Sequence, residues 1–164
     1  MTIGIDLMVL LPLLFVAMWL DLRYRRIPNW LTFSGILSAF LVHGLEKGTA
    51  GLLPTAIGFV AGVLILLIPF AKGGMGAGDV KLLAMIGAWM GVQFLFPACL
   101  WMGMVGLFLS LYAIWRERIW RLALYGLSLK GVTTGVKVPY GIAIGLGTLI
   151  EIGRNVWKSG GGAL

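Results

Sequence analysis

The sequence predicts an all-α, polytopic membrane protein, built as a helical bundle of about six transmembrane helices. The chain has 164 residues, of which 60% are hydrophobic and only 12% are charged, and its mean hydropathy is +0.99. Soluble domains have about 45–50% apolar and about 25% charged residues. The whole chain, residues 1–164, is therefore expected to form one integral-membrane domain.

The net charge of +7 does not indicate nucleic-acid binding. A membrane protein needs basic residues to set its orientation, and no zinc spacing or basic-aromatic surface accompanies the charge. The single cysteine, Cys99, excludes an intrachain disulfide, and with His43 as the one histidine there is no Cys/His metal site. Neither a metal nor a cofactor is expected.

The first spanning helix is expected over residues 3–20, since a span needs about 20 mostly apolar residues. Asp6 falls in its first turn, where a carboxylate favours the helix dipole and the outer headgroups. Basic residues start only at Arg23, after the apolar run, whereas a cleavable signal peptide carries them before it. We therefore expect a retained helix with its N-terminus outside.

Two further helices are expected over residues 30–45 and 49–71. Pro28 disfavours a helical residue before it, and Asn29 is a good N-cap for the helix that follows. The lone His43 is interpreted as a residue of the membrane interface rather than a ligand or a base.

Residues 82–115 contain no charged residue, which is too long for one span and predicts two short helices. The break is expected near residues 91–93, with Pro97 in the first turn of the second helix, where proline is tolerated. The aromatic residues near this break, Trp89, Phe94 and Phe96, are expected at the membrane interface.

The remaining chain predicts three segments. Residues 116–130 alternate apolar and basic residues, as in an amphipathic helix on the cytoplasmic membrane surface. A final span is expected over 138–152, with Pro139 near its start, and a disordered tail over about 158–164.

The distribution of basic residues supports this orientation. With the N-terminus outside, only Lys47, Arg154 and Lys158 lie on the outer side. The inward-facing loops hold the other ten: Arg23, Arg25, Arg26, Lys72, Lys81, Arg116, Arg118, Arg121, Lys130 and Lys137. Cytoplasmic loops carry such an excess of lysine and arginine.

This topology brings two carboxylates, Asp21 and Asp79, to the cytoplasmic end of the bundle. Two adjacent carboxylates do not both ionise easily, so one keeps its proton and the pair supplies an acid and a base at the same pH. Such a pair can activate water for attack on a peptide bond. Another interpretation stays open, in which Asp79 caps its helix and Asp21 pairs with nearby arginines.

Asp79 ends the stretch Gly76-Ala77-Gly78-Asp79. The two glycines are expected to permit positive φ and a close approach to another part of the chain. Joined to Asp21 and Arg26-Ile27-Pro28-Asn29 upstream, this stretch resembles the type IV prepilin peptidases, which are GxGD-class membrane aspartyl proteases. The segment Val138-Pro139-Tyr140-Gly141 resembles the final-helix motif of that family.

The resemblance implies that Asp21 and Asp79 are the catalytic pair. It implies cleavage of the short basic leader from prepilin-like precursors at the cytoplasmic face of the inner (cytoplasmic) membrane. Gly76 and Gly78 would shape the loop that carries Asp79, and Lys81 is expected to anchor at the membrane interface rather than to tune Asp79. The expected partners are the precursor peptide and the lipid bilayer, and the oligomeric state is left open.

The sequence departs from the larger relatives in one respect. Those relatives carry a cytoplasmic domain with paired cysteines and also N-methylate the trimmed pilin with S-adenosylmethionine. This chain has neither the room nor the cysteines for that domain, and it resembles the compact members of the family, of the tight-adherence-pilus type.

Two other functions remain as alternatives. The same aspartates suit a proton relay in a small proton-coupled transporter, although neither lies near the middle of the membrane, where transport sites are usual. The chain would also suit a non-catalytic assembly subunit of a pilus or secretion system.

Overall fold

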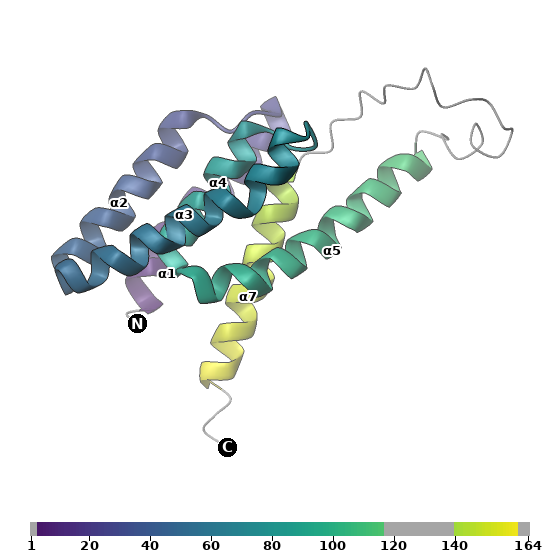
Figure 1. Ribbon diagram of the computed structural model, residues 1–164. Helices are drawn as coiled ribbons and strands as arrows, with labels where there is room; N and C mark the ends of the chain where they lie inside the picture. Colours follow the sequence, from purple (N-terminus) through teal and green to yellow (C-terminus); the bar gives the residue numbers. More distant parts are fainter. Residues whose placement is uncertain (1–2, 117–139, 161–164) are drawn as a thin grey trace, which may run out of the picture.

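The computed structural model describes residues 3–116 and 140–160, and these residues form helices without any strand (Figure 1). The predicted all-α bundle is therefore confirmed. The helices are α1 (Ile3–Tyr24), α2 (Asn29–Lys47), α3 (Thr49–Ala71), α4 (Ala77–Met90), α5 (Val92–Arg116) and α7 (Tyr140–Gly160).

Most helix boundaries agree with the sequence-based expectations. The break between α4 and α5 falls at Gly91, whose φ of 77° lies in the left-handed region that favours glycine. Pro97 is not in the first turn of α5, because the helix begins five residues earlier, at Val92.

The final helix is longer than expected. It runs to Gly160 instead of residue 152 and so includes Lys158 and Ser159, which the sequence placed in the tail. The surface helix expected over 116–130 lies outside the described residues, apart from Arg116 at the end of α5.

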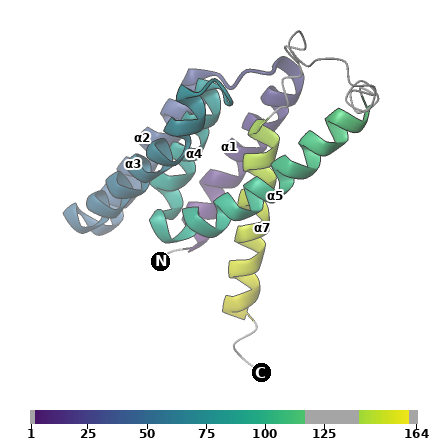
Figure 2. The ribbon, with the colours of Figure 1, turned by 45° about the vertical axis from the view of Figure 1, so that its right-hand side comes forward.

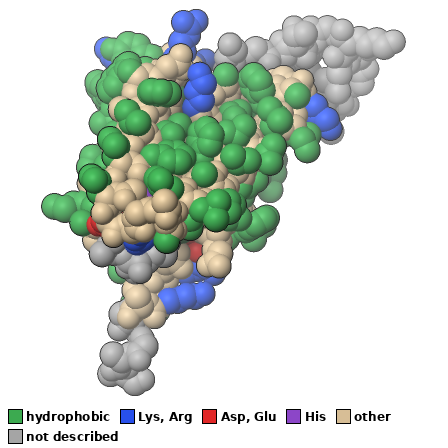
Figure 3. Space-filling view, turned by 60° about the vertical axis from the view of Figure 1, so that its left-hand side comes forward, with side chains coloured by type: hydrophobic (Ala, Val, Ile, Leu, Met, Phe, Trp, Pro, Cys, Tyr) green, Lys and Arg blue, Asp and Glu red, His purple; other side chains and the backbone are tan. Residues whose placement is uncertain are grey.

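Three of the described helices, α1, α3 and α5, are long and apolar enough to cross a membrane. Large apolar side chains cover the outside of the bundle; among them Met8, Phe33 and Phe108 are mostly exposed. Figure 3 shows hydrophobic side chains over the middle of one face, with basic side chains toward its ends. An apolar exterior of this extent fits a lipid environment, in which every spanning backbone must satisfy its own hydrogen bonds.

The shortest described helix, α4, forms the centre of the bundle. All its residues from Asp79 to Trp89 are buried except Lys81. A helix that is apolar on every side is stable only when other helices surround it, and α1, α2, α3, α5 and α7 all pack on α4. Asp79 is thereby held at one end of the most enclosed helix.

Glycines of α3 and α7 allow the closest helix contacts. A methyl group added at Gly58 or Gly62 of α3 would overlap the backbone of α4, and one at Gly147 of α7 would overlap Met102 of α5. Small residues at helix interfaces let backbones approach closely in membranes. These contacts set the position of α4 between α3 and the α5–α7 pair.

The aromatic residues at the α4–α5 break correct one expectation. Trp89 is not at the membrane interface but buried, and its indole N–H donates to the carbonyl of Gly35 on α2 at 2.8 Å. Phe94 is also buried, whereas Phe96 is exposed. Burial is the better site for Trp89, because the Gly35 carbonyl satisfies its N–H.

The ends of the helices are sorted between the two ends of the bundle. The α1–α2 connection, the α3–α4 connection and the start of α7 lie together, as both ribbon views show. The N-terminus, the α2–α3 turn and the end of α7 lie toward the other end (Figure 2). The last turns of α5 extend away from the other helices, with Phe108, Tyr112 and Trp115 exposed.

Candidate active site

A cavity of about 500 Å³ lies where the α1–α2 and α3–α4 connections meet. Both aspartates singled out in the sequence line it, although 58 positions separate them in the chain. The other lining residues come from the same two motifs: Arg25, Arg26, Ile27, Pro28, Asn29, Gly76, Ala77 and Gly78.

Asp79 is positioned by the start of α4. Its N–H donates to the carbonyl of Gly76 at 3.1 Å, and its Oδ2 accepts from the N–H of Gly76 at 3.0 Å. This reciprocal pair caps the helix, as in a capping box. The carboxylate is therefore fixed in the first turn of α4.

Burial raises the pKa of Asp79 to about 6. The Gly76 N–H opposes this rise, and the nearby charge of Asp21 adds to it. Asp79 lies in the first turn of α4, outside the three helices of spanning length. A carboxyl group that takes up a proton near neutral pH is suited to act in proton transfer.

Asp21 is held between the end of α1 and the start of α7. Its side chain is buried, and the N–H groups of Gly141 and Ile142 at the start of α7 interact with its carboxylate. Its Oδ2 is buried without a hydrogen-bond partner among the described residues. A buried, unpartnered oxygen is costly in a folded protein, and a catalytic role is one reason for a protein to keep it.

Gly141 was not predicted as a site residue, although it lies in the late motif that the sequence pointed to. A methyl group at this position would lie 2.5 Å from Oδ2 of Asp21. The absence of a side chain therefore makes room for the carboxylate. The motif was the available signal, but its contact with Asp21 depends on the packing of α7 against α1.

The two glycines before Asp79 act differently from the expectation. Neither has positive φ: Gly76 is extended, with φ of −82°, and Gly78 is helical. The expected close approach is present at Gly78, where a methyl group would lie 3.2 Å from Cβ of Ile27. Gly78 thus lets the two motifs pack against each other.

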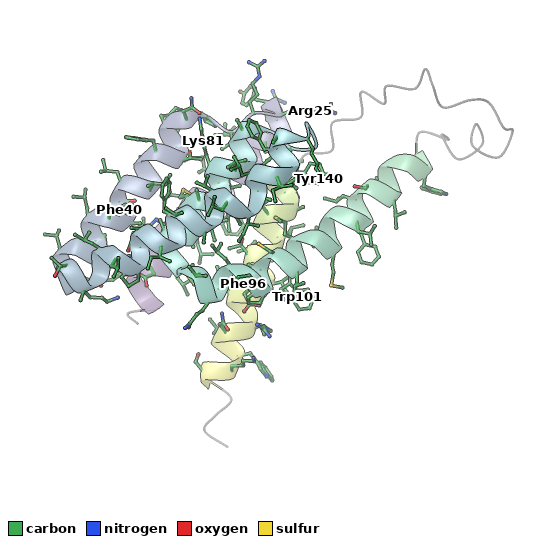
Figure 4. The ribbon with its side chains drawn as sticks, in the orientation of Figure 1. Arg25, Phe40, Lys81, Phe96, Trp101 and Tyr140 are labelled. Carbon is green, nitrogen blue, oxygen red and sulfur yellow. The ribbon has the colours of Figure 1, made fainter. Side chains whose placement is uncertain are left out.

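Lys81 links the same two motifs. Its Nζ donates to Oδ1 of Asn29 at 2.8 Å, and Figure 4 shows Lys81 at the end of the bundle where Arg25 and Tyr140 also lie. Pro28 precedes Asn29 at the N-terminus of α2 in an extended conformation. Asn29 is the first residue of that helix rather than its N-cap, so its side chain is available to Lys81.

The alternative interpretation of the aspartates is seen only in part. Asp79 does cap α4, but Asp21 forms no contact ion pair with an arginine among the residues that the structure describes. The charge of Arg25 acts on the Asp21 carboxylate without a side-chain ion pair.

A second buried polar cluster lies at the opposite end of the bundle. His43 contacts Oγ1 of Thr55 through Nδ1 at 2.6 Å and Oδ1 of Asp6 through Nε2 at 3.2 Å, and its ring meets Trp89 edge-on. The expectations that His43 and Asp6 face the interface and the headgroups were therefore wrong. Inside the bundle each of the two side chains is the other's polar partner, which lowers the free-energy cost of burying both.

The cavity lined by Asp21 and Asp79, the dyad cavity, combines two buried carboxylates with about 500 Å³ of open space. Burial raises the pKa of one of them, Asp79, to about 6. Within the described residues no cluster of acidic, histidine and cysteine side chains could hold a metal ion. General acid–base chemistry by the carboxylates is the chemistry that this arrangement supports.

Comparison with known proteins points the same way. Over 116 residues the chain is 32% identical to a prepilin leader peptidase/N-methyltransferase of Bacillus subtilis, and over 110 residues it is 36% identical to one of Aeromonas hydrophila. A relative of the same name from Xanthomonas campestris is 29% identical over 145 residues.

These alignments cover 68%, 62% and 84% of this chain but only 45%, 38% and 46% of the respective relatives, so the chain spans less than half of their length. No solved structure matches. The model of the type IV leader peptidase family matches residues 8–114, a segment that includes both aspartates and both motifs around them. By this match over most of its length, the chain belongs to the type IV leader peptidase family.

Proposed function

We propose that this protein is a membrane aspartyl endopeptidase that removes the short basic leader peptide from type IV prepilin-like precursors. Asp21 and Asp79 are its catalytic pair. The proposal covers the proteolytic step only, because the family match lies on the residues that carry this pair. Following the resemblance to compact relatives, the expected substrates are precursors of tight-adherence pili.

One observation carries the proposal: two buried carboxylates from two distant motifs line the same cavity. Asp21 is 6% exposed and Asp79 is 8% exposed. Burying two acids is costly in a helical membrane protein, and such residues are by default functional. The names of the relatives then indicate the class of substrate.

The reaction follows from the acid–base pair. The ionised carboxylate removes a proton from a water molecule, whose oxygen attacks the scissile carbonyl carbon. The protonated carboxyl group gives its proton to the carbonyl oxygen, and the leaving amine takes a proton as the C–N bond breaks. No covalent intermediate with the enzyme is needed.

The proposed cytoplasmic location of the site is supported by charge. The α1–α2 and α3–α4 connections, which carry the site, hold Arg25, Arg26 and Lys72. The α2–α3 turn at the opposite end is preceded by Lys47 alone among basic residues. This asymmetry is the one that the positive-inside rule associates with the cytoplasm.

The test is cleavage of a type IV prepilin in membranes that contain wild-type protein, Asp21→Asn or Asp79→Asn. Each variant should cut at least about 10³-fold more slowly, since an amide can neither accept nor donate the required proton. Cleavage is measured by the mobility shift and the new N-terminus of the product.

The matched control is Glu46→Gln, which removes a carboxylate at the other end of α2, far from the cavity. It should cleave within about twofold of wild type, because Glu46 lies at the opposite end of α2 from the cavity and does not line it. Cleavage at wild-type rate by either aspartate variant would refute the proposed pair.

A further inference from the structure

Arg25 has an unusual backbone conformation directly beside the candidate catalytic pair. It is the one non-glycine residue with positive φ (50°) in the described part of the chain. Its N–H donates to the carbonyl of Asp21 at 2.8 Å and so closes the last turn of α1. Helices commonly end this way, but with glycine at that position.

The left-handed conformation brings Cβ close to the following carbonyl oxygen and is unfavourable for residues other than glycine. Strained residues of this kind persist where the surrounding structure holds them, and they concentrate at functional sites. The observation therefore raises the question of what the arginine side chain does that glycine would not.

The position of Arg25 gives an answer. The residue lines the dyad cavity, and its positive charge acts on Asp21. Figure 4 shows Arg25 at the end of the bundle where Tyr140 begins α7. An opposite charge near a carboxylate favours its ionised form.

The start of α7 acts in the same direction. The N–H groups of Gly141 and Ile142 interact with the Asp21 carboxylate, and the N-terminus of a helix favours a negative charge. Gly141 leaves the space that the carboxylate occupies. Burial of the Asp21 side chain disfavours its ionised form, and the two amides and the one cation oppose that effect.

Asp79 has fewer groups that favour ionisation. A single backbone N–H, that of Gly76, donates to its carboxylate, and the charge of Asp21 opposes its ionisation. In a pair of interacting carboxylates, such a difference decides which one keeps the proton.

The other charged or titratable residues around the pair do not reverse this difference. Arg26 lines the cavity beside Arg25, whereas Lys81 is bonded to Asn29 and Lys72 is not among the lining residues. The ring of Tyr140 lies toward Gly106 of α5.

We propose that Arg25 is a positioning residue whose strained helix-end conformation places its charge so that Asp21 stays ionised as the base while Asp79 holds the proton as the acid. This inference rests on the proposed function.

In the first step the Asp21 carboxylate takes one proton from water, the oxygen bonds to the peptide carbon, and the Asp79 proton passes to the carbonyl oxygen. In the second step the Asp21 proton passes to the nitrogen as the C–N bond breaks. Asp79 takes a proton back from the tetrahedral carbon's hydroxyl, which leaves a carboxylic acid, an amine and the original enzyme.

The test measures the pH dependence of kcat/KM for prepilin cleavage by wild type and two substitutions. Arg25→Asn keeps a residue that tolerates the left-handed conformation but removes the charge. The acidic limb of this variant's pH profile should move to higher pH by about 0.5 unit, because Asp21 loses a stabilising cation that is partly screened by solvent. Below that limb, cleavage should fall about threefold relative to wild type, as expected for such a shift.

Arg25→Lys restores the charge and should return the acidic limb to within experimental error of wild type. Arg23→Asn removes a charge from the last turn of α1, two residues before Arg25, and Arg23 does not line the cavity. It is the matched control and should leave the limb in place. A merely structural role of Arg25 would lower cleavage equally at every pH.

The outcomes separate the two proposals. An unchanged limb in Arg25→Asn, or a shifted limb that Arg25→Lys does not restore, would overturn the role of Arg25 while the catalytic pair stands. Retained cleavage in Asp21→Asn would overturn the pair itself, and the role of Arg25 with it.

Discussion

At the scale of single residues, the site is assembled from short contacts between two motifs. Lys81 bonds to Asn29 and Gly78 packs on Ile27, and both contacts join the first residues of α4 to the segment that follows α1. Within the second motif, Asp79 accepts from the N–H of Gly76 and caps α4. The roles expected for these residues from the family resemblance stay predictions, but their positions give each a physical task in holding the two carboxylates over one cavity.

The raised pKa of Asp79, about 6 against an ordinary value of 3.8, predicts a pH-dependent stability. The folded protein binds a proton more tightly at this site than the unfolded chain does. The stability that the protein gains from binding this proton is therefore fully present below pH 3.8 and is lost as the pH rises through about 6.

Asp79→Asn should therefore be the more stable protein at pH 7.5, by up to about 3 kcal/mol of unfolding free energy. The advantage should shrink as the pH falls toward 4. Thermal unfolding of both proteins in the same detergent between pH 4 and 8 measures it. An advantage that stays constant over this range would show that Asp79 does not titrate as stated.

At the scale of helices, α4 depends on close contact with α3. Gly58 of α3 and Gly87 of α4 face each other, and a methyl group on either would overlap the backbone of the other helix. Because α4 begins with the turn that carries Asp79, the α3–α4 contact also supports the site.

Gly58→Ala should destabilise the protein by about 1–3 kcal/mol, since a tightly packed contact has no room for an added methyl group. Gly103→Ala on α5 is the matched control, because a methyl group there meets nothing within 4 Å. It should be neutral or stabilising by about 0.5–1 kcal/mol, as expected for alanine in place of glycine inside a helix. Unfolding temperatures of the two variants check this, and equal effects would contradict the packing argument.

At the scale of the whole molecule, apolar side chains cover the bundle between two ends that differ in charge. The α1–α2 and α3–α4 connections share the basic end, which also holds the dyad cavity. The buried cluster of Asp6, His43 and Thr55 lies at the other end. Orientation in the membrane therefore decides which compartment the proposed catalytic pair faces.

Cysteine labelling tests that orientation. In a Cys99→Ser background, Lys72→Cys and Lys47→Cys place one exposed thiol at each end of the bundle. An impermeant maleimide added to intact cells should label Lys47→Cys and leave Lys72→Cys unlabelled until the membrane is opened, as the positive-inside rule predicts. The reverse pattern would place the candidate site outside and refute the proposed cytoplasmic face.

The sequence by itself determined what depends on local chemistry: the apolar spans, the glycine break at Gly91, and the two motifs around Asp21 and Asp79. It also predicted that these aspartates share one end of the bundle, because alternating spans and basic loops sort the chain between two surfaces. The bounds of α3 were predicted to the residue for the same local reason.

Only the tertiary structure decided which helices touch. It brought Gly141 to Asp21, buried Trp89 against Gly35, and paired His43 with Asp6. These contacts join residues 37 to 120 positions apart, and no local pattern encodes them. Their physical basis is the packing of α4, α1 and α7 at glycine-lined contacts, which selects the partner for each buried polar group.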